Sequence, residues 1–348
     1  MRSATLLSSL AALAQLGAAS YVLYDDYPMG EAFFDRWTFF TSADPTNGYV
    51  TYVDQSTAQS AGLISVDGNN SVYIGVDHTN IASGSGRQSV RLTSTSTYTH
   101  GLIILDLAHM PGSICGSWPA FWTVGADWPN NGEIDIIEGV NQQTTDAMTL
   151  HTSDNCTINN TGFTGTLSTS NCYIDAPGQS NNAGCGIDST STQSYGDGFN
   201  RIGGGVYATE WTSSAISIWF FPRGSIPSDI TSGSPNPSGW GEPVANFAGD
   251  CDIDSHFGAQ NLVFDITFCG DWAGNVWSSG SCASLASTCN DYVQNNPSAF
   301  TETYWTINSL QVYEDSSSSK AKREAKTETE TGESRRQSRR RSHGIKIN

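Results

Sequence analysis

The chain of 348 residues carries thirty-four acidic and sixteen basic side chains, which gives a formal net charge of −18 at pH 7. Ten of the basic residues lie in residues 316–348, and no lysine precedes Lys320. So acidic a protein will not bind nucleic acids or anionic membranes through electrostatic attraction, and its charge suits an uncharged polymer as partner.

The first twenty residues have the pattern of a secretory signal peptide. A basic residue beside the initiator methionine is followed by an apolar run over residues 6–16 and by small residues at 17–20. The run is too short to span a membrane, and no later stretch is long and apolar enough to do so. We therefore predict a signal peptide at residues 1–20 and a secreted, extracellular protein that begins near Tyr21.

Short stretches of alternating apolar and polar residues recur between clusters of Gly, Ser, Asn and Pro. Three of them are residues 71–76 (SVYIGV), 215–220 (AISIWF) and 304–307 (YWTI). A period of two, rich in β-branched and aromatic residues, predicts half-buried strands, and the 35 glycines suit the turns between them. Because no linker or repeat interrupts residues 21–315, we predict one all-β domain there, an antiparallel sandwich, and expect it to be monomeric.

Residues 132–139 (GEIDIIEG) place three carboxylates, Glu133, Asp135 and Glu138, within six residues. Side chains alternate faces along a strand, so Glu133 and Asp135 share a face whereas Glu138 should point away from them. One extra residue near 136–137, a β-bulge, restores the alternation and returns Glu138 to the face of its partners. We therefore predict a bulged strand that presents a carboxylate trio (Glu133, Asp135 and Glu138).

Such a trio suits hydrolysis of a glycosidic bond with retention of configuration. That reaction needs two carboxyls about 5–5.5 Å apart, one as nucleophile and one as acid/base. With the bulge, the Cα atoms of Glu133 and Glu138 lie about 13 Å apart, and long side chains that lean together on a concave sheet close much of that gap. Asp135 between them can hold the nucleophile and, by like-charge repulsion, keep the acid protonated. The spacing does not fix which glutamate takes which role.

Further motifs stand in order around the trio. They are residues 86–92 (GRQSVRL), 100–111 (HGLIILDLAHMP), 117–122 (SWPAFW) and 269–274 (CGDWAG). With the trio they resemble glycoside hydrolase family sixteen in its bulged, laminarinase-like form, and in particular secreted fungal endo-1,3(4)-β-glucanases, over about residues 24–314. The resemblance implies a concanavalin A-like β-jelly-roll sandwich with a cleft across its concave sheet, and a β-glucan polysaccharide as substrate.

The resemblance also implies roles for single residues. Glu133 matches the family's nucleophile, Glu138 its acid/base and Asp135 its supporting carboxylate. His151, in the stretch MTLHTS, matches a family histidine on the adjacent strand that contacts the catalytic group.

Aromatic side chains near these motifs are candidates for sugar binding, because sugar rings present apolar C–H faces to aromatic rings. We predict that Trp118, Trp128 and Trp272 line the cleft, and we assign Trp122 to the core. Arg87 is a candidate donor to substrate hydroxyls, with pairing to an acidic residue as its alternative.

The eight cysteines lack zinc-finger spacing, which predicts disulfides, and 105 complete pairings are open. Asn-x-Ser/Thr triplets that begin at Asn69, Asn155 and Asn159 are candidate N-glycosylation sites.

We expect no metal and no cofactor. The aspartates of residues 250–256 (DCDIDSH) are spaced like the start of a calcium loop, but Ser255 and Asn261 replace the Gly and Glu that an EF-hand requires. A calcium site of another kind stays open. Neither Gly-x-Ser-x-Gly nor His-Glu-x-x-His occurs, so a serine hydrolase and a zinc protease have no support.

Residues 316–348 lack aromatic and nearly all apolar side chains, which predicts a disordered basic tail. The family's catalytic domain ends near Tyr313, so the resemblance assigns the tail no role. For residues 21–315 the sequence predicts a glycoside hydrolase, a retaining endo-1,3(4)-β-glucanase. A glucan-binding lectin, which would need the aromatics but not the trio, and a glucan transglycosylase are the alternatives.

Overall fold

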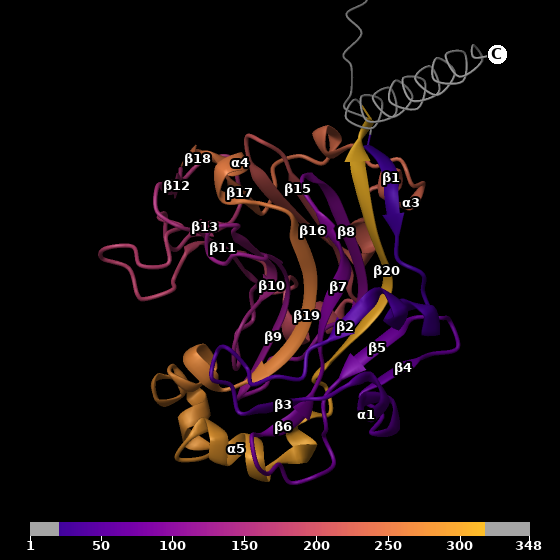
Figure 1. Ribbon diagram of the computed structural model, residues 1–348, viewed down its shortest axis with the longest axis vertical. Coiled ribbons are helices and arrows are strands. Elements are labelled where there is room, and N and C mark those ends of the chain that lie inside the picture. The colour runs from indigo at the N-terminus through magenta and orange to yellow at the C-terminus, as the bar shows by residue number, and fades with distance from the viewer. Residues whose placement is uncertain (1–20, 317–348) are drawn as a thin grey trace, which may run out of the picture. The chain divides into compact units, whose positions relative to one another are not determined.

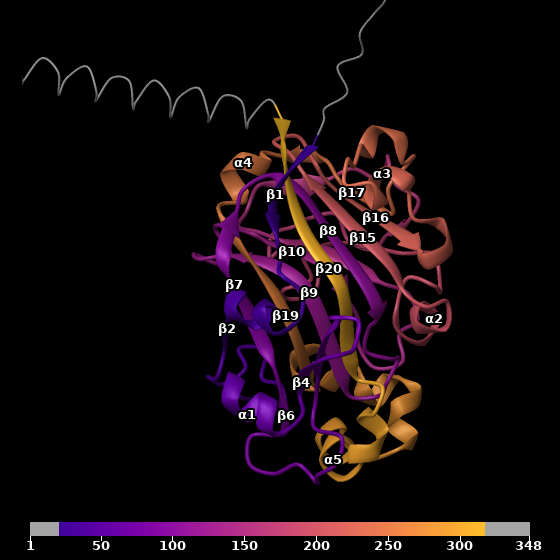
Figure 2. The ribbon, with the colours of Figure 1, turned by 90° about the vertical axis from the view of Figure 1, so that its right-hand side faces the viewer.

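Two antiparallel sheets face each other in the compact unit Tyr21–Glu314 of the computed structural model, which describes residues 21–316 (Figures 1 and 2). The predicted signal peptide at 1–20 and residues 317–348 of the predicted tail lie outside the described residues. The predicted domain boundaries therefore stay predictions.

Each large sheet has eight strands, and the order in which neighbours pair is far from the chain order. In the first sheet the order is β17 (Ala245–Phe247), β16 (Ile216–Pro222), β15 (Gly205–Trp211), β8 (Gly101–His109), β20 (Tyr304–Asp315), β5 (Val72–Gly75) and β4 (Ile64–Val66), with β1 (Tyr21–Asp26) paired to β20. In the second sheet it is β13 (Thr166–Leu167), β14 (Cys185–Asp188), β11 (Ala147–His151), β10 (Glu133–Glu138), β9 (Ser117–Gly125), β19 (Gln260–Phe268), β7 (Arg91–Tyr98) and β2 (Trp37–Phe39). All three stretches predicted as strands from alternation overlap observed strands of this fold, namely β5, β16 and β20.

Two small sheets and short helices complete the described fold. The small sheets pair β12 (Cys156–Ile158) with β18 (Gly249–Cys251), and β3 (Val50–Tyr52) with β6 (Arg87–Ser89). The helices are η1 (Glu31–Arg36), α1 (Gln55–Ser60), α2 (Gly196–Arg201), η2 (Arg223–Ser225), α3 (Ser228–Thr231), η3 (Pro237–Gly239), α4 (Ile253–His256), η4 (Gly270–Gly274), η5 (Trp277–Ser279), η6 (Ser281–Ser284), α5 (Cys289–Asn295) and η7 (Pro297–Phe300). Among residues 21–316, no helix combines the length and the apolar character needed to cross a membrane.

The main core lies between the two large sheets. Phe264 of β19 packs edge-to-face against Trp305 of β20, so these two fully buried rings join the second sheet to the first. On its own sheet Phe264 also packs against Phe121 of β9. Truncating one such buried ring to Ala typically costs about 3–5 kcal/mol of stability. The facing sides of the two large sheets are thus buried together in this core.

The second sheet is bowed, and β9, β10 and β19 curve around the open side of the sandwich in Figure 1. The pairing register shifts between Asp135 and Ile137 on β10 and between Asn261 and Val263 on β19. Such irregularities bend a strand and increase its local twist. They help this sheet to present a concave outer face.

All eight cysteines form disulfides, as predicted, and the structure fixes the pairing that the sequence left open. The bonds are Cys115–Cys282, Cys156–Cys251, Cys172–Cys185 and Cys269–Cys289. Cys269–Cys289 joins the end of the central strand β19 to α5, so it fixes the loop with η4, η5 and η6 beside the concave face.

Candidate active site

The predicted bulge is confirmed, and Ile136 is the extra residue. On β9, Trp122 lies opposite Asp135 and Phe121 lies opposite Ile137, so no residue of β9 is left to pair with Ile136. Ile134, Ile136 and Ile137 are all buried in the core, and the two glutamates stay partly exposed. The trio therefore shares the concave face of the second sheet.

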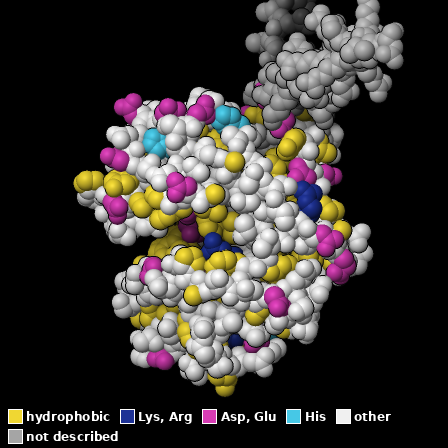
Figure 3. Space-filling view, in the orientation of Figure 1, with side chains coloured by type: hydrophobic (Ala, Val, Ile, Leu, Met, Phe, Trp, Pro, Cys, Tyr) yellow, Lys and Arg dark blue, Asp and Glu magenta, His cyan; other side chains and the backbone are white. Residues whose placement is uncertain are grey.

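The concave face is hollowed where β10 crosses it. Hydrophobic side chains line much of this hollow in the space-filling view, with acidic side chains inside it (Figure 3). Asp135, at the centre of the trio, is only 2% exposed. A polymer lying in this cleft would meet the trio from one side only.

His151 lies beside the central carboxylate, as the family resemblance implied. It ends β11, directly opposite Glu133 in the antiparallel register. Its Nε2 atom is 3.2 Å from Asp135 Oδ2, and the imidazole is buried. The histidine therefore contacts the Asp135 carboxylate and can orient it.

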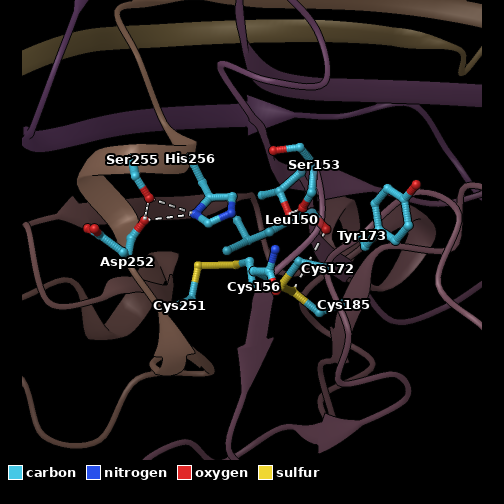
Figure 4. The surroundings of a disulfide bond; sticks show 12 residues. Leu150, Ser153, Cys156, Cys172, Tyr173, Cys185, Cys251, Asp252, Ser255 and His256 are labelled. Atoms are coloured by element: carbon cyan, nitrogen blue, oxygen red, sulfur yellow. Dashed lines mark hydrogen bonds between the residues drawn. A yellow bond between two sulfur atoms is a disulfide. The ribbon is translucent and has the colours of Figure 1, made fainter.

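The backbone behind His151 is tightly confined. Gly184 has a φ of +60°, and a Cβ atom there would collide with the Leu150 carbonyl and come within 2.9 Å of His151 Nδ1. The next residue forms the Cys172–Cys185 disulfide, which lies near Cys156–Cys251 (Figure 4). Glycine and the cross-link together let this loop pack against β11.

Two predicted tryptophans lie at the Glu138 end of the trio. The indole N–H of Trp118 donates a hydrogen bond of 2.8 Å to Glu138 Oε1. Trp272 packs edge-to-face against Trp118, with ring centroids 5.7 Å apart. Both rings are partly exposed, so they can offer apolar surface while Trp118 holds the carboxyl.

Trp128 lies at the other end of the trio. Its side chain is 41% exposed, and its hydrogen bond to the Glu133 carboxyl offsets only part of the rise that burial and the charge of Asp135 produce in the pKa of that group. An exposed indole at this place can offer a broad apolar face beside the trio. The structure thus brings three of the predicted tryptophans to the trio.

Arg87 does not belong to the cleft, so its prediction as a substrate-binding residue is wrong. The side chain is fully buried and donates to the backbone carbonyls of Asp77, Asn80 and Val293. Its guanidinium also lies 4.7 Å from the ring centroid of Phe300. Arg87 therefore ties loops together inside the protein, and neither of the two alternatives weighed from the sequence describes it.

The prediction for Trp122 is also wrong, in the opposite direction from that for Arg87. We assigned it to the core, but it lies partly exposed on the same face of β9 as Trp118. Its indole N–H donates to Asp265 Oδ1 at 3.3 Å, and the Arg91 guanidinium lies 4.9 Å from its ring centroid. Asp265 and Arg91 are site neighbours that sequence reasoning missed.

The carboxyls of the trio have raised pKa values because the cleft buries them close together. Burial, and then the charge of Asp135, raises the pKa of Glu133 to about 8. The same two causes raise the pKa of Glu138 well above its usual range, and burial also raises the pKa of Asp135. Three carboxylates in one buried site cannot all be ionised near neutral pH, so the site retains protons.

A metal ion is the other use that this donor set permits. Glu133, Asp135 and His151 each offer one ligand atom, and these atoms lie within 4.8 Å of one another. The expectation that the chain needs no metal stays a prediction. Retained protons and a hydrogen bond from Trp118 suit acid–base chemistry at the same carboxyls.

A jelly-roll sandwich with a carboxylate trio in a cleft flanked by tryptophans defines a carbohydrate-cleaving enzyme, a glycoside hydrolase. Residues 37–313 match the XgeA-like catalytic domain of glycoside hydrolase family 16. The chain belongs to this family, and the predicted family and fold class are confirmed.

Three similar proteins place the chain within the family. An endo-1,3(4)-β-glucanase of Arthroderma benhamiae is 51% identical over 309 residues, which cover 88% of this chain and 67% of that protein. Two solved structures each have a TM-score of 0.80 and cover 85% of this chain and 100% of theirs. One is an elongating family 16 β-1,3-glucosyltransferase, 52% identical. The other is laminarinase 16A from Phanerochaete chrysosporium, 46% identical, with β-glucans in donor and acceptor sites.

The chain spans about half the length of several curated relatives that it matches, among them probable endo-1,3(4)-β-glucanases of Neosartorya fischeri and Aspergillus fumigatus.

Proposed function

We propose that this chain is a secreted endo-β-glucanase that hydrolyses β-1,3 or mixed β-1,3/1,4 glucans with retention of anomeric configuration. One observation carries the proposal: the bulge at Ile136 turns all three carboxyls of the trio toward one cleft. The names of similar proteins, endo-1,3(4)-β-glucanase and a laminarinase with bound β-glucans, support a glucan as substrate.

The chemistry runs in two displacements at the anomeric carbon. The Glu133 carboxylate attacks that carbon while Glu138 gives its proton to the departing glycosidic oxygen, so a glycosyl ester forms on Glu133. Glu138, now ionised, takes a proton from a water molecule whose oxygen attacks the same carbon. The ester bond breaks, Glu133 is released as a carboxylate, and the two inversions give net retention.

The proton shared within the trio must leave Glu133 before the attack. Asp135 is the acceptor that we assign, because its carboxyl is hydrogen-bonded to that of Glu133. A protonated Asp135 donates to the nucleophile and leaves one oxygen of Glu133 free to react. His151, 3.2 Å from Asp135, keeps that carboxyl in place.

The aromatic side chains would position the polymer. Trp118 and Trp272 lie at the acid/base end and Trp128 at the nucleophile end, so a chain stacked on them would place one glycosidic bond over the trio. Substrate contact by these residues and by His151 belongs to this proposal.

The direct test is release of reducing sugar from laminarin by the purified protein, with Glu133→Gln and Glu138→Gln as controls. We expect activity in the wild type and a loss of several orders of magnitude in kcat in both variants, with their fold intact. Proton NMR of the first product should show the β-anomer before mutarotation. The α-anomer in first place would contradict the two-displacement mechanism.

Glucan transfer is a second candidate, because the β-1,3-glucosyltransferase structure is 52% identical. The same glycosyl ester would then be attacked by a sugar hydroxyl instead of water. Incubation with a laminari-oligosaccharide separates the two, since transfer gives products longer than the substrate and hydrolysis gives only shorter ones. A lectin would bind laminarin and yield neither.

Secretion and a monomeric state belong to the same proposal. The signal-peptide pattern of residues 1–20 supports secretion. Protein recovered from the medium of an expressing eukaryotic host should begin near Tyr21 on N-terminal sequencing. Size-exclusion chromatography with light scattering should give the mass of a single chain.

A further inference from the structure

Asp146 holds the backbone of Glu138 from the side away from the cleft. Its side chain is fully buried, and its Oδ1 atom accepts a hydrogen bond of 2.9 Å from the Glu138 N–H. Its own N–H donates to Ser194 Oγ at 3.0 Å, and its carbonyl accepts from the Ser189 N–H at 2.8 Å. Three hydrogen bonds thus fix Asp146 between the last residue of β10 and the segment that follows β14.

Resting on the proposed function, we propose that Asp146 is a positioning residue for the acid/base Glu138 and that it acts as a neutral carboxylic acid. No feature of the local sequence pointed to it, because it lies in the connection between β10 and β11.

The bulge explains why Glu138 needs such a support. β11 pairs with β10 only as far as Asp135, which lies opposite Thr149. Beyond the bulge no β11 residue is in register with Glu138, and its N–H bonds to the Asp146 carboxyl instead. Because a buried N–H without a partner is costly, loss of this bond would let the end of β10 shift.

The surroundings of Asp146 favour the neutral form. Among the described residues no basic side chain forms an ion pair with it. The titratable groups that face it are the acids Glu138 and Asp188 and the buried phenols Tyr195 and Tyr207. Burial raises the pKa of Asp146 well above its usual range. Hydrogen bonds from the Glu138 N–H and the Tyr207 hydroxyl oppose this rise, and the charges of Glu138 and Asp188 add to it. A neutral carboxyl keeps its accepting oxygen for the backbone and adds no charge beneath the acid/base.

Two substitutions of Asp146 distinguish its support of the Glu138 backbone from any effect of its charge. Asp146→Asn keeps an oxygen acceptor of the same size without an ionisable group. We expect it to retain kcat within about twofold and to leave the alkaline limb of the pH–kcat profile in place. Asp146→Leu keeps most of the volume but removes the acceptor. We expect it to lower kcat on laminarin about tenfold to hundredfold with KM nearly unchanged, because the acid/base carboxyl is displaced.

The matched control is Asn200→Leu, on α2. Asn200 Oδ1 also accepts a backbone N–H just past the end of a strand, that of Met110 at 3.0 Å, on the first sheet. We expect this variant to lower the thermal midpoint and to leave kcat as in the wild type.

Each outcome decides the proposal. If Asp146→Leu loses only thermal stability, as the control does, Asp146 is structural and the proposal fails. If Asp146→Asn moves the alkaline limb to lower pH, the native carboxyl is charged and the neutral assignment fails. Should the Leu variant not fold, the Asn variant still decides: a folded Asn variant with low kcat contradicts the proposal, and one with full activity and an unchanged limb supports it. A wild type inactive on laminarin would refute the proposed function separately.

Discussion

Replacing Glu133, the proposed nucleophile, should make the protein more stable at neutral pH. Burial and the charge of Asp135 raise the pKa of Glu133 from 4.5 to about 8. The folded state therefore binds this proton more tightly than the unfolded chain does, so its contribution to stability is full below about pH 4.5 and is lost as the pH rises through 8. Glu133→Gln has no proton to lose and should escape this loss.

The size of the effect follows from the same pKa. A tenfold change in proton affinity is worth about 1.4 kcal/mol, so the full shift corresponds to about 5 kcal/mol at most. Glu133 is partly exposed on the cleft side, where solvent screens its charge, and we reduce the expectation to about 1–3 kcal/mol at pH 8. For a domain of this size that corresponds to a gain of about 2–6 °C in thermal midpoint.

The assay is thermal unfolding at pH 4, 6 and 8 at one scan rate, with Glu242→Gln as the control at an exposed site. The midpoint of Glu133→Gln should equal that of the wild type at pH 4 and exceed it progressively toward pH 8, and the control should not. A difference in midpoint that stays constant with pH, or a variant less stable than the wild type at pH 8, would contradict a raised pKa of Glu133 in the folded protein.

Three further predictions concern the bulge, the central carboxylate and the misassigned arginine. Asp135→Asn should cost less kcat on laminarin than either Glu→Gln change, because Asp135 supports the reaction and forms no bond to the sugar; a kcat below that of both Glu→Gln variants would contradict the assigned roles. Deleting Ile136 should destabilise the protein but leave measurable activity on laminarin. Deleting Ile134 should abolish folding or activity, because it turns apolar residues outward. Equal losses of thermal midpoint and activity in the two deletions would contradict the bulge. Arg87→Met should lower the midpoint of denaturant unfolding, because it leaves buried backbone carbonyls without a hydrogen-bond donor. The KM on laminarin should be unchanged in the folded fraction. A raised KM without a loss of stability would indicate that Arg87 belongs to the cleft after all.

The part of the site that could be predicted is the part that a single strand encodes. Alternation alone makes Glu138 face away from Glu133, and only an extra residue reconciles the two, so the bulge follows from residues 133–138. The same parity places Trp122 on the face of Trp118, a signal that our assignment of Trp122 to the core overlooked.

The part that could not be predicted depends on contacts between distant segments. Arg87 is buried because it donates to the Val293 carbonyl, 206 positions along the chain. Asp146 matters because the bulge ends the pairing of β10 with β11. The sequence around Asp146 contains no pattern that predicts its burial or its hydrogen bond to Glu138. Polar residues whose partners are backbone groups of other segments give no periodic pattern.

The Cys172–Cys185 disulfide lies where it can compensate for the stability that the buried carboxyls of the trio remove. Gathering carboxyls in a buried cleft raises their pKa values and so lowers stability above about pH 4.5, by about 1–3 kcal/mol for Glu133 alone. The Cys172–Cys185 disulfide spans 13 positions and adjoins Gly184, which packs against His151. Closing a loop of that length is worth about 3 kcal/mol in the chain-entropy account, which is of the same order. A cross-link at this place therefore offsets the destabilising charges while holding rigid the strand that orients the central carboxylate.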